Sequence, residues 1–373
     1  MNKILSILSV SFFFGITWVV SFNFALVVLA PMLLLAILFM GNPFPLKVSN
    51  IYIILAFFIM FIFLFIINIT LYTHINYYYI DEFLKKMIFT FSVFSFIILF
   101  YSSRKELLIK SIDYVLLIIV LLWYMQFVVF YSTGEYIDLL DFLPSGRPQR
   151  YQAYWIQSSL PFDVIRPTSI YIEPGTYAVN TLPFLILSFL YHEKLTKLHI
   201  FLLISYFGTL SLFAIIVASA FIFIVEMSRF EFKFSKKNLL MLVIFGLIAI
   251  GIEQYLYFRF VAEENMGAVG LRESIIDYWL ALDEIQLVLG QGNAQVVFER
   301  AAVEDASFIF KLVFEYGVFS IPYLLLMMYV SRGLPIFFLG IILITKLHYE
   351  LYIIWFYFAA LHLIMQEKRS LKL

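Results

Sequence analysis

The sequence predicts an all-α, polytopic integral membrane protein. Of its 373 residues, 63% are hydrophobic and only 13% are charged, whereas soluble domains carry about 25% charged residues. Apolar runs of roughly 17–20 residues, long enough to cross a bilayer as a helix, recur along the chain between short polar joints. Membrane β-barrels show alternating segments of about ten residues instead, and the sequence contains none.

The apolar runs predict about twelve transmembrane helices in a single membrane domain, residues 1–373. We expect them at 4–20, 23–40, 51–70, 85–101, 112–131, 175–191, 198–210, 212–228, 239–258, 307–330, 334–346 and 350–366. Two polar joints, 132–174 and 259–306, are much longer than the rest. The first run resembles a signal peptide, but no small-x-small cleavage site follows it, so we expect it to remain as the first span.

The positions of Lys and Arg predict the orientation, because cytoplasmic joints are enriched in both residues. The basic joints at 104–110, 194–197 and 229–237 and the basic tail are expected in the cytoplasm. Two of these joints are consecutive, so the chain between them must cross the membrane twice, and a tight turn is expected at 208–211. Both termini are then cytoplasmic and both long polar stretches are extracytoplasmic. Lys85 and Lys86 fall on the outer side, against the rule.

Composition and missing motifs exclude several functions. The net charge is zero, which gives no basis for binding nucleic acid. Without Cys, a His-x-x-x-His pair or an Asp-x-Asp motif, the sequence predicts no metal site and no cofactor. No Gly-x-Ser-x-Gly nucleophile elbow is present either. The five His are scattered: His192, His199 and His362 are expected near the cytoplasmic side, and His348, between the last two spans, is expected outside, where it could reach a site.

The basic residues of the two long polar stretches are all Arg, although Lys outnumbers Arg by 15 to 10 in the whole chain. A loop that needs only solubility has no reason to exclude Lys. Arg offers a planar fork of donors that matches phosphate or carboxylate. The bias therefore predicts a polyanionic ligand at the outer face, bound by Arg147, Arg150, Arg166, Arg259, Arg272 and Arg300.

The first long stretch ends in Arg166-Pro-Thr-Ser-Ile-Tyr-Ile-Glu173-Pro174-Gly-Thr-Tyr177-Ala. Pro174 suits the first turn of a helix, where its missing N–H costs nothing. Glu173 would then lie beside the positive end of the helix dipole, which favours its ionised form. On these local features alone, Arg166 and Glu173 form either an interfacial anchor or part of a functional site.

The second long stretch contains a predicted amphipathic helix at 274–289, which follows Arg272 and is expected to rest on the membrane surface. It should end at Gly290-Gln-Gly292-Asn, a stop and turn signal. These two glycines could also cradle a phosphate, but no Lys-Ser/Thr pair follows to complete a nucleotide loop. Glu304 and Asp305 come just before the tenth predicted span.

These motifs resemble those of bacterial Wzy-type repeat-unit polymerases, which make O-antigen and capsular polysaccharide. The resemblance lies in the topology, in Arg166…Glu173-Pro174-Gly-x-Tyr177-Ala, and in Arg272…Trp279…Gly290-x-Gly292 followed by Asp305-x-Ser-Phe…Gly317. The motifs cover about 60 positions. The related O-antigen ligases carry a His-Asn pair where this chain has Glu304-Asp305, and that difference favours a polymerase.

The resemblance implies a metal-independent, GT-C-like membrane glycosyltransferase in the bacterial cytoplasmic (inner) membrane. Donor and acceptor would be oligosaccharides on undecaprenyl pyrophosphate, and the partners would be the bilayer and the chain-length regulator and flippase of the same pathway. Arg166 and Arg272 would stabilise charge on the leaving pyrophosphate, and Glu173 or Asp305 would be the general base. Substrate contacts would come from Arg300, Arg147, Arg150, Tyr177, Gly290 and Gly292.

Two alternatives stay open at this point: an O-antigen ligase, and a flippase or transporter of lipid-linked oligosaccharide. Transporters carry polar or charged residues in the middle of the membrane. Charged residues in the predicted spans, such as Asp113, Glu226 and Glu253, lie near span ends. This pattern favours the polymerase.

Overall fold

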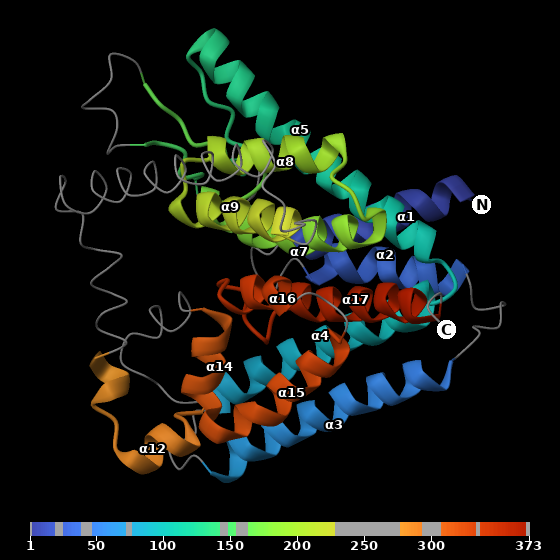
Figure 1. The fold of residues 1–373 in the computed structure, drawn as a ribbon, viewed down its shortest axis with the longest axis vertical. Coiled ribbons are helices and arrows are strands. Elements are labelled where there is room, and N and C mark those ends of the chain that lie inside the picture. The colour runs from blue at the N-terminus through green and yellow to red at the C-terminus, as the bar shows by residue number, and fades with distance from the viewer. Residues whose placement is uncertain are drawn as a thin grey trace, which may run out of the picture. The chain divides into compact units, whose positions relative to one another are not determined.

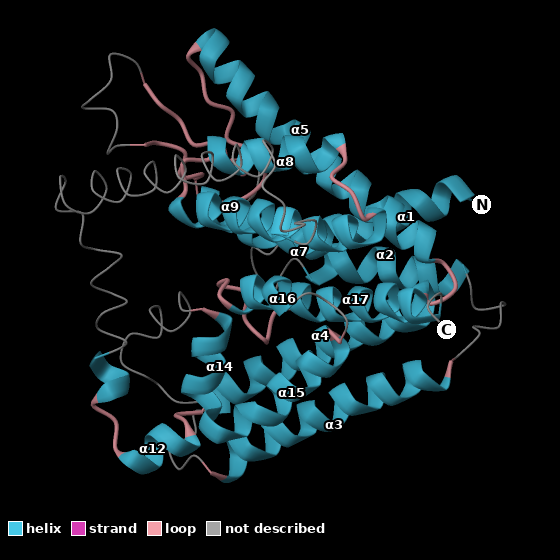
Figure 2. Ribbon diagram, viewed as in Figure 1, coloured by secondary structure: helices cyan, strands magenta, loops and turns pink. Residues whose placement is uncertain are grey.

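The structure of the protein is a computed structural model that describes residues 2–18, 25–38, 47–71, 77–141, 148–153, 163–227, 277–292, 307–332 and 336–370. Every regular element in these residues is a helix, joined to its neighbours by loops and turns (Figures 1 and 2). The all-helical prediction is therefore confirmed for the part of the chain that the structure describes.

The helices follow the predicted apolar runs closely. All of the predicted spans except 239–258, which lies outside the described residues, contain helix. The helices are α1 (Asn2–Thr17), α2 (Ala25–Leu38), α3 (Val48–Thr70), α4 (Tyr77–Tyr101), α5 (Lys105–Thr133), α7 (Pro174–His192), α8 (Lys197–Gly208), α9 (Leu212–Met227), α12 (Glu284–Leu289), α14 (Phe308–Tyr316), η3 (Gly317–Phe319), α15 (Ser320–Val330), α16 (Ile336–Leu343) and α17 (Tyr352–Ser370).

Four helical stretches among the described residues are long and apolar enough to cross a membrane: 48–70, 80–101, 105–133 and 308–330. Others are shorter than the hydrocarbon core of a bilayer, which is about 30 Å thick. At 1.5 Å per residue, the eight residues of α16 cover only about 12 Å. The structure thus supports membrane association, whereas the number of spans stays a prediction.

The chain divides into two compact units. Unit 1 contains residues 1–118, 179–199 and 275–373, and unit 2 contains residues 119–178 and 200–274. In unit 1, α4 packs along α17, α1 packs on α2, and α3 packs on α4 (Figure 1). The helices α5, α7 and α8 belong partly to each unit.

Aromatic side chains fill the core of unit 1. The ring of Phe57 lies 4.3 Å from that of Phe94 and 5.0 Å from that of Trp355, centroid to centroid. Such tilted contacts add to the stabilisation from burying apolar surface. The opposite face of α3 exposes Ile51, Leu55 and other apolar residues. A helix that buries one apolar face and exposes another suits a protein surrounded by lipid.

The predicted span 307–330 corresponds to the helical stretch 308–330, which a short 3₁₀ turn interrupts. α14 ends at Tyr316, a 3₁₀ turn follows, and α15 begins at Ser320 (Figure 1). The break lies at Gly317, whose φ of 49° and ψ of −127° are outside the helical region. Glycine is the residue that adopts such a conformation at low cost. With nine residues, α14 is about 14 Å long.

The predicted surface helix 274–289 is interrupted within its described residues, which corrects the sequence prediction. Residues 277–280 form one helical turn, and α12 starts afresh at Glu284. Asp283 causes the restart, because its carboxylate accepts the N–H of Gln286 and the Gln286 side chain caps the Asp283 N–H in return. Such a capping box favours a helix start over a helix interior.

The turn predicted at 208–211 is present. α8 ends at Gly208 and α9 begins at Leu212, with Leu210 between them at a φ of 49°. Gly208 lies against Trp123, since a Cβ at this glycine would come within 2.6 Å of the indole ring. The missing side chain therefore lets α8 approach α5.

Candidate functional site

Buried amide groups anchor the first long polar stretch to α5 in unit 2. The Gln126 amide oxygen accepts the N–H groups of Thr168 (3.1 Å) and Ser169 (2.8 Å), and its nitrogen donates to the Gln149 side-chain oxygen (2.8 Å). Gln149 in turn donates to the carbonyl groups of Ser169 (2.6 Å) and Tyr171 (3.0 Å). Gln126 and Gln149 are buried, and a buried polar group with its hydrogen bonds satisfied specifies one arrangement of the chain.

Two further groups complete this network. The Tyr136 hydroxyl donates to the Gln149 side-chain oxygen (3.1 Å), and the Asp138 carboxylate accepts the Gln149 backbone N–H (2.8 Å). Burial raises the pKa of Tyr136 above its ordinary value, so the hydroxyl stays protonated and can donate. One signal of this network is visible in the sequence and was overlooked: a Gln inside the apolar run 112–131.

The anchored segments hold Arg166 and Arg150 near each other. Residues 150–153 and 163–166 run antiparallel, with a bridge between Gln152 and Ile165 and an N–H to carbonyl bond from Arg166 to Tyr151 (2.6 Å). The Arg166 guanidinium donates to the carbonyl of Gln152 from Nε (3.0 Å) and Nη2 (2.7 Å). It therefore braces the two segments against each other.

Glu173 pairs with Arg150. Arg150 Nη1 lies 3.8 Å from Glu173 Oε2, and the two side chains are 70% and 37% exposed. Such exposed pairs contribute about 0–1 kcal/mol, so Arg150 can exchange this carboxylate for another anion. Glu173 also accepts the hydroxyl of Thr176 (3.3 Å), and α7 begins at Pro174 as predicted.

Tyr177, predicted to contact substrate, is fully buried in unit 2. Its hydroxyl is 2.5 Å from Ser205 Oγ, and its ring packs edge-on against Tyr171 and Tyr206. Ser205 donates to the carbonyl of Leu202 (2.7 Å), so Tyr177 is the donor to Ser205. In this arrangement the ring joins α7 to α8, and its burial leaves it inaccessible to a ligand.

The backbone N–H groups of Gly290 and Gly292, predicted to contact substrate, form hydrogen bonds within unit 1. Gly290 donates to the carbonyl of Gln286 (2.8 Å) and Gly292 to that of Glu315 (2.7 Å). The Gln291 N–H donates to the Phe314 carbonyl (2.9 Å). The Gly290 bond satisfies a carbonyl group of α12, and the Gln291 and Gly292 bonds satisfy carbonyl groups at the end of α14, so the three N–H groups are not available to a phosphate here. The remaining predicted site residues, Arg147, Arg259, Arg272, Arg300 and Asp305, lie outside the described residues.

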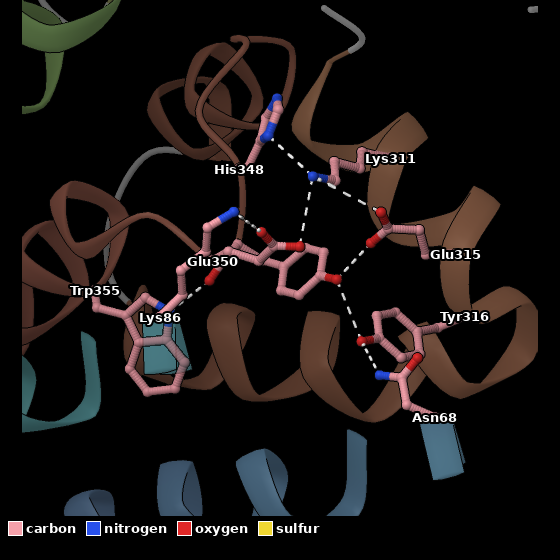
Figure 3. Close-up of polar contacts among 9 residues, drawn as sticks. Asn68, Lys86, Lys311, Glu315, Tyr316, His348, Glu350 and Trp355 are labelled. Atoms are coloured by element: carbon pink, nitrogen blue, oxygen red, sulfur yellow. Dashed lines mark hydrogen bonds and ion pairs between the residues drawn. The ribbon is translucent and has the colours of Figure 1, made fainter. Parts of the chain in front are cut away.

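Sequence reasoning missed a buried charge cluster in unit 1, shown in Figure 3. Lys311 Nζ of α14 lies 3.7 Å from Glu315 Oε1, 3.5 Å from Glu350 Oε1 and 3.1 Å from His348 Nδ1. The side chains of Lys311, Glu315 and Glu350 are only 6–7% exposed. Lys86 of α4 approaches the other oxygen of Glu350 at 3.4 Å and is 35% exposed.

Hydrogen bonds extend this cluster to α3. The Tyr349 hydroxyl donates to Glu315 Oε2, and the Tyr316 and Tyr349 hydroxyls are 3.2 Å apart. Asn68 donates to the Tyr316 hydroxyl at 2.6 Å (Figure 3). Since Tyr349 uses its proton on Glu315, Tyr316 is the donor to Tyr349. The sequence signal was Lys311 and Glu315, four residues apart within a predicted span.

A second polar cluster of unit 1 joins the start of α5 to the end of α7. The Ser188 hydroxyl donates to Asp113 (2.5 Å), His192 Nε2 lies 2.8 Å from the same carboxylate, and His199 Nε2 lies 2.7 Å from Ser188. The Thr196 N–H points at His199 Nδ1, which assigns the ring proton to Nε2. Ser188 and His199 are fully buried. The cluster therefore holds these helices together.

No family model, no curated protein and no solved structure matches this chain. Among the described residues, no group of three or more His, Cys, Asp or Glu side chains is placed to hold a metal ion.

Proposed function

We propose that the chain is a membrane-embedded glycosyltransferase that polymerises oligosaccharide repeat units carried on undecaprenyl pyrophosphate. Reaction would occur at the outer face of the cytoplasmic membrane, within a fold of about twelve spans that has both termini in the cytoplasm. The observation that carries the proposal is the pair Arg150 and Arg166, held on a polar segment that a buried amide network anchors to an apolar helix.

The chemistry needs a cation where the donor lipid leaves. An acceptor hydroxyl attacks the anomeric carbon, the bond from that carbon to the pyrophosphate breaks, and negative charge grows on a phosphate oxygen. Fixed donors aimed at that charge stabilise the transition state. Arg150 suits this role better than Arg166, because its guanidinium is exposed and weakly paired, whereas Arg166 is committed to the Gln152 carbonyl.

The different roles of Arg150 and Arg166 can be tested in cells that make the polymer. We expect Arg150→Ala to shorten or abolish the polymer at normal abundance of the protein in the membrane, with a loss of about 10²–10³ in rate. Arg150→Lys keeps the charge but loses the fork and should recover part of the activity. Arg166→Ala should instead lower the abundance of the protein, because it removes the brace on residues 150–152.

Arg332 provides the matched control, since it is an exposed Arg at the end of α15 whose guanidinium lies over the Tyr329 ring. Arg332→Ala should leave polymer length normal. Normal polymer from Arg150→Ala at equal abundance would contradict the proposed role of Arg150.

The buried charges favour a second candidate, a transporter or flippase of lipid-linked oligosaccharide. Lys311 and Glu315 lie inside the candidate span 308–330, and charged residues at such positions mark transport pathways in many membrane proteins. The glycan profile of a strain that lacks this protein separates the two functions. A lipid carrying a single repeat unit indicates a polymerase, whereas complete loss of transferred glycan indicates a flippase or a ligase.

A further inference from the structure

Ser169, in unit 2, has an unusual backbone conformation for a residue other than glycine. Its φ is 55°, in the left-handed region that costs L side chains free energy. Among the described residues, only Glu193 and Leu210 also combine a side chain with a positive φ. Both follow the ends of helices, α7 and α8, where a positive φ commonly ends a helix. Ser169 ends no helix, since it lies between Arg166 and Glu173, so its strain needs another explanation.

The strained conformation belongs to a tight turn. The N–H of Tyr171 donates to the Thr168 carbonyl (3.1 Å), which makes Ser169 the second residue of a four-residue turn. A positive φ at this position alone is the pattern of a type II′ turn, in which glycine is the usual residue. Serine therefore occupies a position where glycine would cost less free energy.

The turn lies between two backbone contacts that hold the candidate arginines. Before it, the N–H of Arg166 donates to the Tyr151 carbonyl (2.6 Å). After it, the Ile172 carbonyl accepts the N–H of Arg150 (2.7 Å). The position of Ser169 therefore sets where both contacts are made.

The Ser169 hydroxyl makes a contact that glycine cannot make. It donates to the Ile119 carbonyl of α5 (2.9 Å), and the residue is fully buried. The backbone groups of Ser169 are bound as well: its N–H donates to Gln126 (2.8 Å), and its carbonyl accepts from Gln149 (2.6 Å). Strained residues persist only where their surroundings fix them, and they cluster at functional sites. The serine thus combines a costly conformation with a direct bond from the arginine-bearing segment to α5.

We propose that Ser169 is a positioning residue, whose hydroxyl fixes to α5 the segment that holds Arg150 and Arg166. The inference rests on the proposed function for its consequence, because a fixed Arg150 would face the charge that grows on the pyrophosphate oxygen. A donor already in place stabilises such charge better than one that must reorganise. A displacement of about 1 Å from the reactive geometry can cost about 10² in rate.

Ser169→Gly separates this role from a purely structural one. Glycine relieves the strained φ and removes the hydroxyl, while the Ile119 carbonyl, inside α5, keeps its partner within the helix. The thermal unfolding midpoint of the purified full chain in lipid nanodiscs should therefore not fall. Hydrogen exchange at 148–153 and 163–173 should nevertheless become faster by up to about tenfold, since one hydrogen bond is lost. For the extension of lipid-linked repeat units, kcat should fall by more than KM changes.

Two further variants assign the effect to the hydroxyl. Ser169→Ala keeps a Cβ at the strained φ and loses only the hydroxyl, so it should show the same faster exchange and the same lower kcat as Ser169→Gly. Glu193→Gly is the matched control, because Glu193 has the same φ of 55° but is exposed and lies in unit 1. It should relieve similar strain and leave exchange at 148–153 and kcat as in the wild type.

The two readouts together decide the proposal. Faster exchange with an unchanged kcat, or a lower kcat with wild-type exchange, would each overturn the positioning role, and so would wild-type values of both. Where Ser169→Ala does not fold, Ser169→Gly keeps the test decisive, because it carries no strain. If the wild-type chain extends no lipid-linked repeat units, the proposed function fails, and exchange alone then shows whether the hydroxyl fixes the segment.

Discussion

At the scale of single residues, two glycines fix how the second polar stretch meets α14. A Cβ added to Gly317 would come within 2.0 Å of the Val288 carbonyl oxygen, and one added to Gly290 within 2.5 Å of the Glu315 carbonyl oxygen. Both residues also have positive φ angles. The two backbone segments therefore cross at a distance that leaves no room for a side chain.

Gly317→Ala should consequently destabilise the protein. The new methyl group needs the strained φ of 49° and pushes the chain at Val288 away, and such strain alone costs about 1–3 kcal/mol. We expect a lower thermal unfolding midpoint in detergent at a fixed scan rate. Gly340→Ala is the control, because a Cβ there meets nothing within 4 Å and Ala favours a helix over Gly by about 1 kcal/mol. Equal midpoints for the two variants would refute the crossing.

The roles of some of these residues could be predicted from the sequence, whereas the roles of others could not, for physical reasons. Pro174 and Gly290 act locally, at the start and end of helices, and local signals predicted both positions. Gly317 is visible in the apolar run 307–330, but its close approach to Val288 joins positions that are distant in the sequence, so the run alone could not predict that contact. The charge cluster likewise joins Lys86, Lys311 and Glu350 from three separate segments, and only the Lys311–Glu315 spacing was visible beforehand.

At the scale of elements, the first polar stretch depends on its anchor to α5. The Gln149 side chain accepts from Gln126, Tyr136 and the N–H of Leu139 (3.2 Å), and it donates to two carbonyl groups. Its loss would leave several buried groups unsatisfied, each at a cost of about 1–3 kcal/mol. The anchor therefore determines whether Arg150 and Arg166 keep their positions.

Gln149→Ala should release the segments that carry both arginines. The N–H of Arg150 donates to Ile172 (2.7 Å) and that of Arg166 to Tyr151 (2.6 Å), so hydrogen exchange at 148–153 and 163–173 should become faster while exchange in α4 stays as in the wild type. Gln152→Ala is the control, because the contacts described for Gln152 are made by its backbone. If exchange at 148–153 and 163–173 is as slow in Gln149→Ala as in the wild type, the amide network does not anchor these segments.

Sequence patterns predicted elements better than their interruptions. Apolar length sets where a helix can form in lipid, and this signal is strong over 48–70 and 105–133. A capping box makes the helix start again at Asp283. It competes with the amphipathic pattern, which predicted 274–289 as one helix. The cap prevails locally because the Asp283 and Gln286 side chains each satisfy a backbone N–H group at the restart.

At the scale of the whole molecule, the prediction to test is the side of the membrane on which each polar stretch lies. α5 connects a predicted cytoplasmic joint to the first long polar stretch, and its 29 residues reach about 43 Å. That length exceeds the hydrocarbon core of about 30 Å. Arg104, at the joint, donates to the Phe100 carbonyl (3.0 Å) and covers its ring, which keeps a positive charge at the end of α4. By the distribution of positive charge, Ser103 is expected inside and Glu135 outside.

Single cysteines can measure this directly, because the chain contains no Cys of its own. Ser103→Cys, Glu135→Cys and Glu284→Cys all introduce the thiol at exposed positions. In intact cells whose outer membrane, where present, has been permeabilised, an impermeant thiol reagent should label the variants at 135 and 284 and spare the one at 103. Disruption of the cytoplasmic membrane should then make the thiol at position 103 reactive. Labelling at 135 but not at 284 would mean that the chain crosses the membrane an odd number of times between these positions. The predicted pair of crossings joined by the turn at 208–211 would then no longer explain why the joints on both sides of it are basic.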